Sequence, residues 1–242
     1  PSEMSSIYDT LMALPLFQGI SRVLLAELIE KVRFDFEKYQ DGDTIVQAGD
    51  PCNTLCFIVS GEARVDIPFV NKKIHILETI EGPNVICPEN LYGLNPSQLV
   101  NVKAHGVCGT MRLQKADYFN MVKKDEVFLF NILNYLSRNN QATYSNFLAL
   151  NRGTVPEKLS FLITSLTHAG SKDITLAFRR KDMCTMLGVK RTTFYAALEA
   201  MKAEGYIDFT QNEILVIDRS RLFEILKPKD AFEIGALKAK NL

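Results

Sequence analysis

The sequence lacks the features of a membrane-spanning or secreted chain. No apolar run approaches the roughly 18 residues that cross a bilayer, and the run at residues 55–59 is far too short. The N-terminus shows no basic stretch followed by an apolar one, which is the pattern of a signal peptide. From these absences we expect a cytoplasmic protein without a membrane partner.

The chain also lacks the residue sets of metal centres and of enzymes. Structural zinc sites need four Cys or His ligands, usually in closely spaced pairs. The cysteines here form an odd, scattered set without CxxC spacing, so we expect reduced thiols and no metal. Only three histidines are present, and no spacing suggests a nucleophile, a base and an orienting residue, so we predict no catalytic residues and no enzymatic activity. The five cysteines are Cys52, Cys56, Cys87, Cys108 and Cys184.

A strong overall charge is absent as well, but charge is unevenly distributed. Lys and Arg number 28, and Asp and Glu also number 28, so the formal net charge is zero. Residues 1–151 hold 13 basic against 17 acidic side chains, a net charge of −4, whereas residues 152–227 hold 12 against 9, a net charge of +3. Basic charge is therefore concentrated in the C-terminal segment, as a phosphate-binding domain requires.

What the sequence does contain is clearest at residues 178–205, FRRKDMCTMLGVKRTTFYAALEAMKAEG. Apolar residues recur there at spacings of three, four and seven, which predicts two short amphipathic helices. Gly188 lies between them, where a tight turn needs a positive φ that glycine adopts at little cost. Two such helices joined by a short turn form the helix-turn-helix pattern. The apolar faces carry Met183, Met186 and Leu187 on the first helix and Phe194, Leu198 and Met201 on the second.

Two short strands follow this pair of helices. Residues 206–209 and 213–217 are apolar runs on either side of a turn at Gln211-Asn212. Helix, helix and β-hairpin in that order predict a winged helix-turn-helix. A generic helical hairpin with a solvated basic end is the alternative, and the two strands favour the DNA-binding interpretation.

The candidate DNA-binding side chains lie at the starts of the two helices. Lys190, Arg191 and Thr192 open the second helix, and Tyr195 falls on the face away from its apolar stripe. Cations suit phosphates, and arginine, threonine and tyrosine suit phosphates or base edges. The residues that open the first helix are expected to hold phosphates, and they are Arg179, Arg180 and Lys181.

The N-terminal half predicts helices followed by a β-rich domain. Residues 7–31 have helical patterning that is interrupted at residues 14–17, and Ser21 is placed to cap the second helix. Short apolar runs separated by Gly, Asp and Pro turn signals come next, and many short strands at such spacing predict a barrel or jelly roll. The predicted strands are residues 44–47, 55–59, 63–68, 73–79, 100–104 and 109–113.

Two segments of this half resemble a known family. YQDGDTIVQAGDP at residues 39–51 and LCFIVSGEARV at residues 55–65 are similar to the cyclic-nucleotide-binding domain in their glycines and strand pattern. With the winged helix added, the chain resembles the Crp/Fnr superfamily of bacterial transcription regulators over all but its tail. The resemblance implies an α+β fold: a β-roll or jelly-roll sensing domain, a long dimerisation helix and a C-terminal winged helix-turn-helix. The expected divisions are residues 1–121, 122–151 and 152–227, and a tail at residues 228–242.

The resemblance fails where cyclic AMP would bind. Family members that bind it carry an Arg-Ser-Ala run, and Gln98 and Leu99 stand here at the Arg and Ser positions. Without a guanidinium, a buried phosphate loses its bidentate charged partner, and Arg64 would supply only a substitute charge. We therefore disfavour cyclic AMP and expect a pocket that is closed or remodelled for an unknown small-molecule effector. Glu89, which matches the ribose-binding Glu of the family, and Asn90 are the other candidates in this pocket.

No cofactor is predicted. Haem sensing occurs in this superfamily, but a lone histidine in a strand is more often a hydrogen-bonded structural residue than an axial ligand. Neither His75 nor His105 is paired with a second candidate ligand. The N-terminal cysteine cluster of the oxygen-sensing branch is missing, which disfavours an iron-sulfur cluster.

Residues 125–150 contain neither glycine nor proline and predict one helix of about 39 Å. Its apolar seam is interrupted midway by Ser137, Asn139, Asn140 and Gln141. A polar residue in a seam can fix the register of two helices, and the resemblance implies that this helix pairs with its twin. A surface helix on its own domain is the alternative. In the family the midpoint faces the ligand pocket, which makes Asn139 and Asn140 candidate effector contacts.

These expectations combine into one predicted function, a homodimeric and sequence-specific DNA-binding regulator of transcription. Its two recognition helices would lie about 34 Å apart on an inverted repeat in double-stranded DNA. Arg191 matches the Arg that starts the family's recognition helix and is expected to fork onto guanine. Thr192 and Ala196 replace a Glu and an Arg that often read bases, so the operator should differ from the familiar one. RNA polymerase is a candidate partner. The alternative is a ligand-sensing module that acts through protein contacts rather than DNA.

Overall fold

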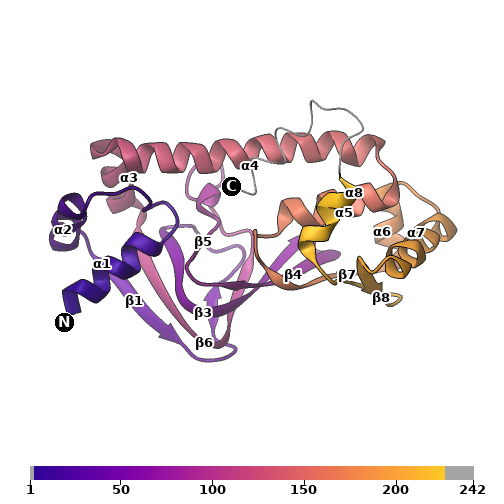
Figure 1. Cartoon of the computed structure of the whole chain (residues 1–242), viewed down its shortest axis with the longest axis horizontal. Coiled ribbons are helices and arrows are strands. Elements are labelled where there is room, and N and C mark those ends of the chain that lie inside the picture. Colours follow the sequence, from indigo (N-terminus) through magenta and orange to yellow (C-terminus); the bar gives the residue numbers. More distant parts are fainter. Residues whose placement is uncertain (1–2, 227–242) are drawn as a thin grey trace. The chain divides into compact units, whose positions relative to one another are not determined.

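The computed structural model describes residues 3–226, and the chain divides into two compact units (Figure 1). The first unit comprises Pro1–Arg64 and Glu81–Ser137, and the second comprises Val65–Ile80 and Arg138–Leu242. A hairpin from the N-terminal half therefore belongs with the C-terminal half, and the long helix contributes to both units. The tail predicted at residues 228–242 lies outside the described residues.

The first unit combines four helices with a β-roll. Both β1 and β2 pair antiparallel with β6, and β5 pairs with β3. The predicted cap is confirmed, because the Ser21 hydroxyl accepts a hydrogen bond from the Leu24 N–H at 3.2 Å. The elements are α1 Glu3–Ala13, α2 Arg22–Lys31, β1 Phe34–Tyr39, β2 Thr44–Val46, the first part of β3 Thr54–Phe69, β5 Asn84–Ile86, the 3-10 helix η1 Pro88–Asn90, β6 Asn101–Gln114, α3 Lys115–Lys124 and the first part of α4 Glu126–Arg152.

The strands β3 and β6 are longer than the sequence predicts. The predicted strands 55–59 and 63–68 form the single strand β3, and the predicted strands 100–104 and 109–113 form the single strand β6. Gly61 has a φ of +77°, and a Cβ at this position would overlap the carbonyl oxygen of Val107. This glycine therefore permits two backbones to approach closely and does not reverse the chain. Strands β1 and β5 have no counterpart among the predicted strands.

One apolar core joins the helices of the first unit to its sheet. Phe17 is only 1% exposed and lies at the centre of this core. Its ring centroid is 6.4 Å from that of Phe34, 5.7 Å from that of Phe57 and 5.4 Å from that of Phe128. Burial of one such side chain stabilises a fold by about 1.5–3 kcal/mol. These contacts hold the roll and α4 of this unit together.

The second unit contains the winged helix-turn-helix. The Thr154 hydroxyl caps α5 by accepting a hydrogen bond from the Glu157 N–H at 3.4 Å. The elements are the hairpin formed by the end of β3 and β4 Ile74–Glu81, the end of α4, α5 Val155–Leu166, β7 Lys172–Phe178, α6 Arg180–Leu187, α7 Arg191–Ala203, β8 Ile207–Phe209, β9 Glu213–Val216, the 3-10 helix η2 Arg219–Arg221 and α8 Leu222–Ile225.

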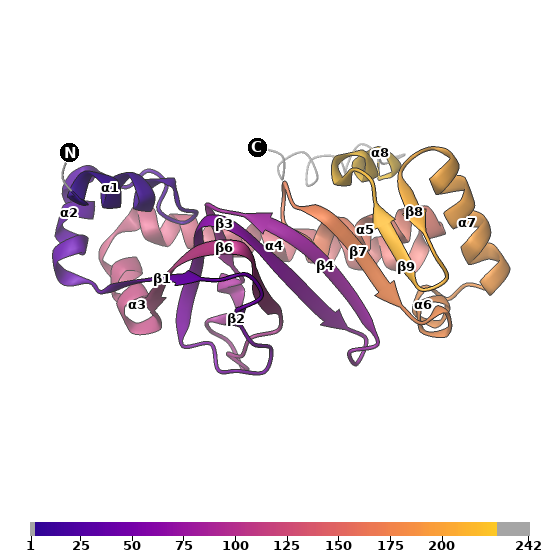
Figure 2. The same ribbon diagram turned by 90° about the horizontal axis from the view of Figure 1, so that it is seen from below.

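The sheet of the second unit has the order β4-β7-β9-β8, and all of its pairs are antiparallel (Figure 2). Ile74 at the start of β4 pairs with Phe178 at the end of β7, and Glu213 at the start of β9 pairs with Ala177. This register brings two turns to the same end of the sheet. They are the hairpin turn, residues 70–73, and the wing turn, residues 210–212. We name this end of the sheet the turn edge.

Apolar packing explains why the hairpin belongs to the second unit. Ile74 and Ile76 of β4 are fully buried and lie in one core with Leu176 and Phe178 of β7. Phe178 also contacts Phe194 of α7, with ring centroids 5.8 Å apart. Backbone pairing and side-chain burial therefore both attach β4 to the helix-turn-helix.

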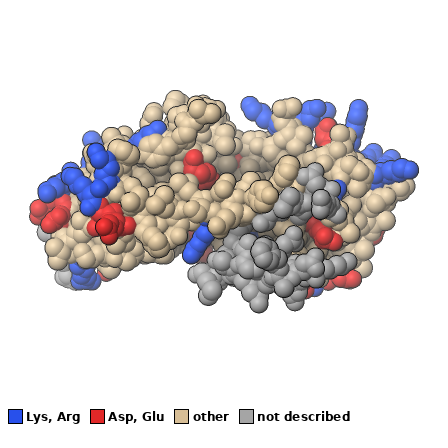
Figure 3. Space-filling model, turned by 90° about the horizontal axis from the view of Figure 1, so that it is seen from above, with Lys and Arg blue, Asp and Glu red and all other residues tan. Residues whose placement is uncertain are grey.

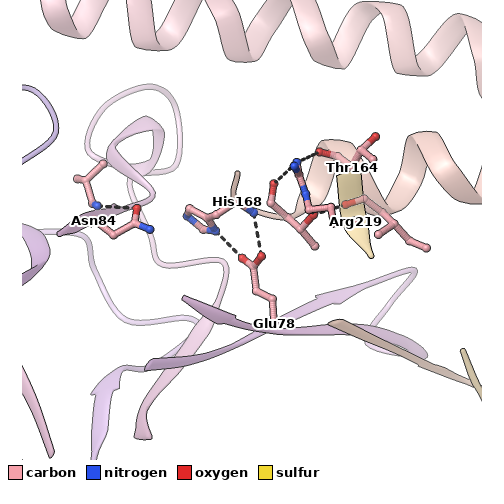
Figure 4. Close-up of polar contacts among 8 residues, drawn as sticks. Glu78, Asn84, Thr164, His168 and Arg219 are labelled. Carbon is pink, nitrogen blue, oxygen red and sulfur yellow. Dashed lines mark hydrogen bonds and ion pairs between the residues drawn. The ribbon is translucent and has the colours of Figure 1, made fainter. Parts of the chain in front are cut away.

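The opposite end of this sheet, which we name the buried end, holds polar side chains that are paired with one another (Figure 4). Glu78 is 0% exposed, and its carboxylate accepts a hydrogen bond from the His168 N–H at 2.8 Å and contacts His168 Nδ1. Arg219 donates to the Thr167 hydroxyl and to the Thr164 carbonyl oxygen, both at 2.8 Å. Burial lowers the pKa of Arg219, and the nearby Glu78 opposes that shift. Nothing in the sequence pattern marked this pairing.

The predicted α+β fold is confirmed: a β-roll, a long helix and a winged helix-turn-helix occur in that order. The long helix α4 contains 27 residues. Within residues 3–226, no helix combines the length and the apolar character needed to cross a membrane.

Candidate nucleic-acid interface

Helices α6 and α7 form the helix-turn-helix on the core of the second unit. Gly188 has a φ of +65° and ends α6 as a left-handed cap, its N–H donating to the Thr185 carbonyl at 3.2 Å. Met183 and Leu187 of α6 lie in the same core as Phe194 and Leu198 of α7, and none of the four is more than 2% exposed. The predicted apolar faces are confirmed, and the opposite faces are left to solvent.

The start of α7 presents an exposed basic surface. Lys190, Arg191 and Thr192 are all exposed, as the sequence predicts. Lys190 occupies the N-cap position but makes no side-chain hydrogen bond to the helix. The first N–H groups of a helix lack partners within it and carry its positive dipole end, so this terminus adds to the charge of the two cations. An anionic phosphate is the ligand that such a terminus suits.

The start of α6 carries the second predicted set of cations. Arg179 directly follows β7 and therefore lies at the turn edge, with Arg180 and Lys181 beginning the helix. Arg179 and Lys181 are exposed, and Arg180 is half-buried. Lys and Arg side chains gather on the part of the second unit that carries α6 and α7 (Figure 3).

Tyr195 lies differently from the prediction, which placed it on the exposed face of α7. Its side chain is half-buried, and its ring packs against Phe194 and Phe209 with centroids 5.1 Å and 6.3 Å apart. The hydroxyl donates to the Gln211 carbonyl oxygen at 3.0 Å. Tyr195 therefore links α7 to the wing turn. The preceding Phe194 is a core residue, and spacing alone did not reveal that the neighbouring wing would cover Tyr195.

The wing turn is held in place by backbone and side-chain bonds. The Phe178 N–H donates to the Asn212 carbonyl oxygen at 2.9 Å, which ties the turn to the end of β7. Beside it, Lys202 Nζ lies 3.2 Å from Asp208 Oδ1. A hydrogen bond from the Phe209 N–H, aided by Lys202, lowers the pKa of Asp208, so this carboxylate is ionised at neutral pH. Gln211 is exposed at the tip of the turn.

The predicted effector residues of the first unit differ widely in exposure. Glu89 is exposed and Asn90 is 8% exposed, whereas Arg64 is half-buried. Leu99 is 60% exposed. Gln98 donates from Nε2 to Cys52 Sγ at 3.2 Å, and its Oε1 is buried without a hydrogen-bond partner. The two residues at the phosphate-binding positions thus make no cationic site.

Asn139 and Asn140, the other two candidate effector contacts, are exposed. Both belong to the second unit, together with the C-terminal part of α4. Their contact with an effector stays a prediction.

Sequence reasoning missed a polar network in the roll. Arg112 Nη2 donates to the Tyr39 hydroxyl at 3.3 Å and also contacts the Ile45 carbonyl oxygen. The Tyr39 hydroxyl in turn donates to Glu37 Oε2 at 2.9 Å. Burial raises the pKa of the nearby Cys56 thiol to about 11, although Arg112 opposes the shift. The sequence carries no signal of this network, because the position of Arg112 between Met111 and Leu113, two buried apolar residues of an alternating strand, predicts an exposed side chain.

The cysteines and His75 behave as structural residues. None of the five cysteines forms a disulfide, and burial raises the pKa of Cys52 and of Cys108. His75 is hydrogen-bonded, as the sequence leads us to expect: its Nδ1 lies 2.8 Å from Asp66 Oδ1, and its Nε2 lies 3.1 Å from the Lys72 carbonyl oxygen. Over the described part of the chain, no three or more His, Cys, Asp and Glu residues are grouped so that they could hold a metal ion.

Two known domains match the chain, in the order that the residues predict. Residues 36–125 match the cyclic nucleotide-binding domain, and residues 145–225 match the Crp-like helix-turn-helix domain. The chain belongs to the Crp/Fnr superfamily. It is thus a Crp/Fnr-type transcription regulator with an N-terminal domain of the cyclic-nucleotide-binding type. A comparison with curated protein sequences found no match.

Several solved structures of Crp/Fnr-type proteins are similar to this chain. The catabolite activator protein of Thermus thermophilus is 16% identical, with 87% of this chain and 97% of that chain covered and a TM-score of 0.45. FixK2 of Bradyrhizobium japonicum is 16% identical, with 83% and 100% covered and a TM-score of 0.48. DNR of Pseudomonas aeruginosa is 18% identical, with 92% and 99% covered and a TM-score of 0.45.

Proposed function

We propose that this Crp/Fnr-type regulator is a homodimer that binds an inverted-repeat operator in double-stranded DNA, under the control of a small-molecule effector. The observation that carries the proposal is the exposed and basic start of α7, which has no side-chain cap and whose helix packs on a buried apolar core. Arg191 would fork onto guanine in the major groove, and Thr192 would stand beside it. Lys190 and the three cations at the start of α6 would hold phosphates and so fix the position of α7.

Dimerisation would occur through α4. Phe130, Leu133, Tyr144 and Phe147 of this helix are 65%, 53%, 66% and 62% exposed. Positions 130, 133, 137, 140, 144 and 147 alternate by three and four residues, which is the seam of a coiled coil. The two central positions of the seam are polar, Ser137 and Asn140. A second copy of the helix would bury the aromatic ends of the seam, while the polar centre would fix its register.

We propose that the first unit binds the effector and that cyclic AMP is not that effector. The Gln98 side chain donates a hydrogen bond to Cys52, and the side chain of Leu99 is largely exposed. Neither residue can give a phosphate the charge-assisted bidentate bond that it requires when buried. We expect the regulator to act in the cytoplasm, where promoter DNA and RNA polymerase would be its partners.

Selection from random duplex DNA by the purified protein tests the function directly. Recovery of a palindrome with half-sites about one helical turn apart is the expected result. The alternative, a sensing module that acts through protein contacts, predicts no salt-dependent affinity for DNA at all. Weak, salt-sensitive binding without a motif would instead show that an effector is needed, and the selection would be repeated with candidate ligands.

A parallel measurement of mass by analytical ultracentrifugation tests the dimer. Leu133→Asp places a charge in the seam and should give a monomer. The matched control is Val23→Asp, because Val23 is 74% exposed on α2 and outside the seam. If the Leu133→Asp protein remains a dimer, then α4 does not form the dimer interface.

A further inference from the structure

We infer that the hairpin turn, residues 70–73, is a second phosphate-binding element of the winged-helix unit, placed on the other side of β7 from the wing. The inference rests on the proposed function, because it concerns how the same surface holds DNA. It assigns a DNA contact to a segment that lies about 100 residues before the helix-turn-helix in the sequence. The side chains that would make this contact are Lys72 and Lys73.

Strand register places the hairpin turn beside the predicted DNA-binding residues. Ile74, directly after the turn, pairs with Phe178, and Arg179 directly follows Phe178. On the other side of β7, the Phe178 N–H bonds the wing turn at Asn212. Neighbouring strands lie about 4.8 Å apart, so two strand spacings, about 10 Å, separate the hairpin turn from the wing turn. Both turns therefore flank Arg179 at the turn edge.

The charge of this edge fits a polyanion. Lys72 and Lys73 are exposed, and the Lys73 side chain is 59% exposed even though its Nζ lies 4.0 Å from Asp182 Oδ1. The acidic side chains near this edge include Asp66, which faces His75, together with Asp182 and Glu213, and the five cations outnumber these three. A surface contact of this length leaves the lysine free to exchange its carboxylate for a phosphate, because exposed ion pairs contribute little. The cations of the edge are Lys72, Lys73, Arg179, Arg180 and Lys181.

The shape of the hairpin turn does not depend on its lysine side chains. Val70, Asn71 and Lys72 have φ values of +51°, +53° and +63°, so the chain reverses through three left-handed residues. The His75 ring fixes this reversal, since its Nε2 faces the Lys72 carbonyl oxygen and its Nδ1 faces Asp66. Removing the two ammonium groups should therefore leave the turn in place.

The test compares two proteins that lose equal charge at different sites. Lys72→Ala with Lys73→Ala removes the hairpin cations. Lys123→Ala with Lys124→Ala is the matched control, because these two lysines are also adjacent and exposed but lie at the end of α3 in the first unit. Binding to the selected operator and to a scrambled duplex is measured at several salt concentrations. A third protein, Lys72→Arg with Lys73→Arg, keeps the charge and should bind like the natural protein.

Each bound phosphate contributes about 0.9 to the slope of log affinity against log salt concentration. Compared with the natural protein, the hairpin variant should show a slope that is smaller by about 1 for each phosphate that it no longer binds. Its affinity for both duplexes should fall by the same factor, about tenfold at low salt. The control should match the natural protein.

Equal slopes for the hairpin variant and the control would overturn the inference, and the hairpin would then be free to contact a protein such as RNA polymerase. If the natural protein shows no salt-dependent DNA affinity, the proposed function itself fails. If the natural protein binds its operator and the hairpin variant behaves like the control, the inference alone is wrong.

Discussion

The two ends of the β4-β7-β9-β8 sheet carry similar side chains in opposite settings. At the turn edge, Arg179 reaches solvent just before α6, and Arg191 does so at the start of α7. At the buried end, Arg219 donates to a hydroxyl and to backbone carbonyls, and Glu78 is fully buried against His168. One end has cations available for an external anion, whereas the polar groups of the other are used within the fold.

This difference separates recognition from stability within one small unit. A buried polar group that loses its partner costs free energy whether or not DNA is present. Removing an exposed cation should change the free energy of unfolding very little. It should weaken DNA binding only where the cation contacts a phosphate or a base. Variants at the two ends should therefore fall into two classes. Variants at the buried end should destabilise the unit, whereas variants of the exposed cations should leave it folded but weaken its preference for the operator sequence.

The largest effect is expected at the buried end, from His168→Ala. The substitution leaves the Glu78 carboxylate with the residue-168 N–H but without the imidazole, in a site that is 0% exposed. Breaking a buried pair on one side should lower the free energy of unfolding by about 3 kcal/mol. Urea unfolding measures this loss, and His105→Ala, at an exposed position, is the control. A loss below about 1 kcal/mol, the range of a surface pair, would show that the buried end is not a stabilising device.

The next effect is expected at the exposed start of α7, from Arg191→Ala. Specific operator binding should weaken by about 1–3 kcal/mol, with non-specific binding retained and the free energy of unfolding unchanged. Arg219→Ala is the reciprocal variant, and it should lower stability by about 1–3 kcal/mol while the operator preference is kept. Titrations with the operator and with a scrambled duplex measure the binding preference of each variant, and urea unfolding measures its free energy of unfolding. An unchanged preference in Arg191→Ala would contradict the assignment of this residue to base reading.

The smallest effect is expected from Tyr195→Phe, which removes one hydroxyl from the link between α7 and the wing. The lost bond to the Gln211 carbonyl should cost about 0.5–1 kcal/mol and weaken operator binding only a few-fold. Tyr206→Phe is a matched control in the same unit, because its hydroxyl lies 3.4 Å from Glu224 Oε2, a longer contact. If Tyr195→Phe loses base preference as strongly as Arg191→Ala, then Tyr195 itself reads DNA and its contact with the wing is secondary.

The helix-turn-helix was largely predictable because local patterns specify it. Apolar spacing, a glycine between two helices and basic residues at helix starts are all readable within 28 residues, and the structure places them accordingly. Tyr195 is the exception. Its exposure depends on a neighbour 16 residues away, the wing, whose turn approaches the tyrosine only after the strands have paired.

The buried end and the sheet itself could not be predicted in the same way. Glu78 and His168 are 90 positions apart, and only the pairing of β4 with β7 brings them together. The long strands β3 and β6 were divided in the prediction because glycine signals a turn more often than a close approach of two backbones. In the roll, Arg112 looked like an ordinary surface residue of an alternating strand, and its partners come from β1 and from the Ile45 carbonyl.

The pairing of β4 with β7 makes the winged helix-turn-helix depend on a segment of the chain that is synthesised several seconds before it. At about 5–20 residues per second, the ribosome would finish position 178 several seconds after position 74, its partner. Until then the hairpin would present an open strand edge, and such edges pair readily with other chains. A fragment that begins at residue 138 would lack the hairpin altogether and leave one side of β7 without its neighbour. A chimaeric protein that takes only the winged helix-turn-helix from this chain should therefore be unstable. Such a chimaera should include residues 65–80, or substitute polar residues on the edge of β7 that their removal exposes.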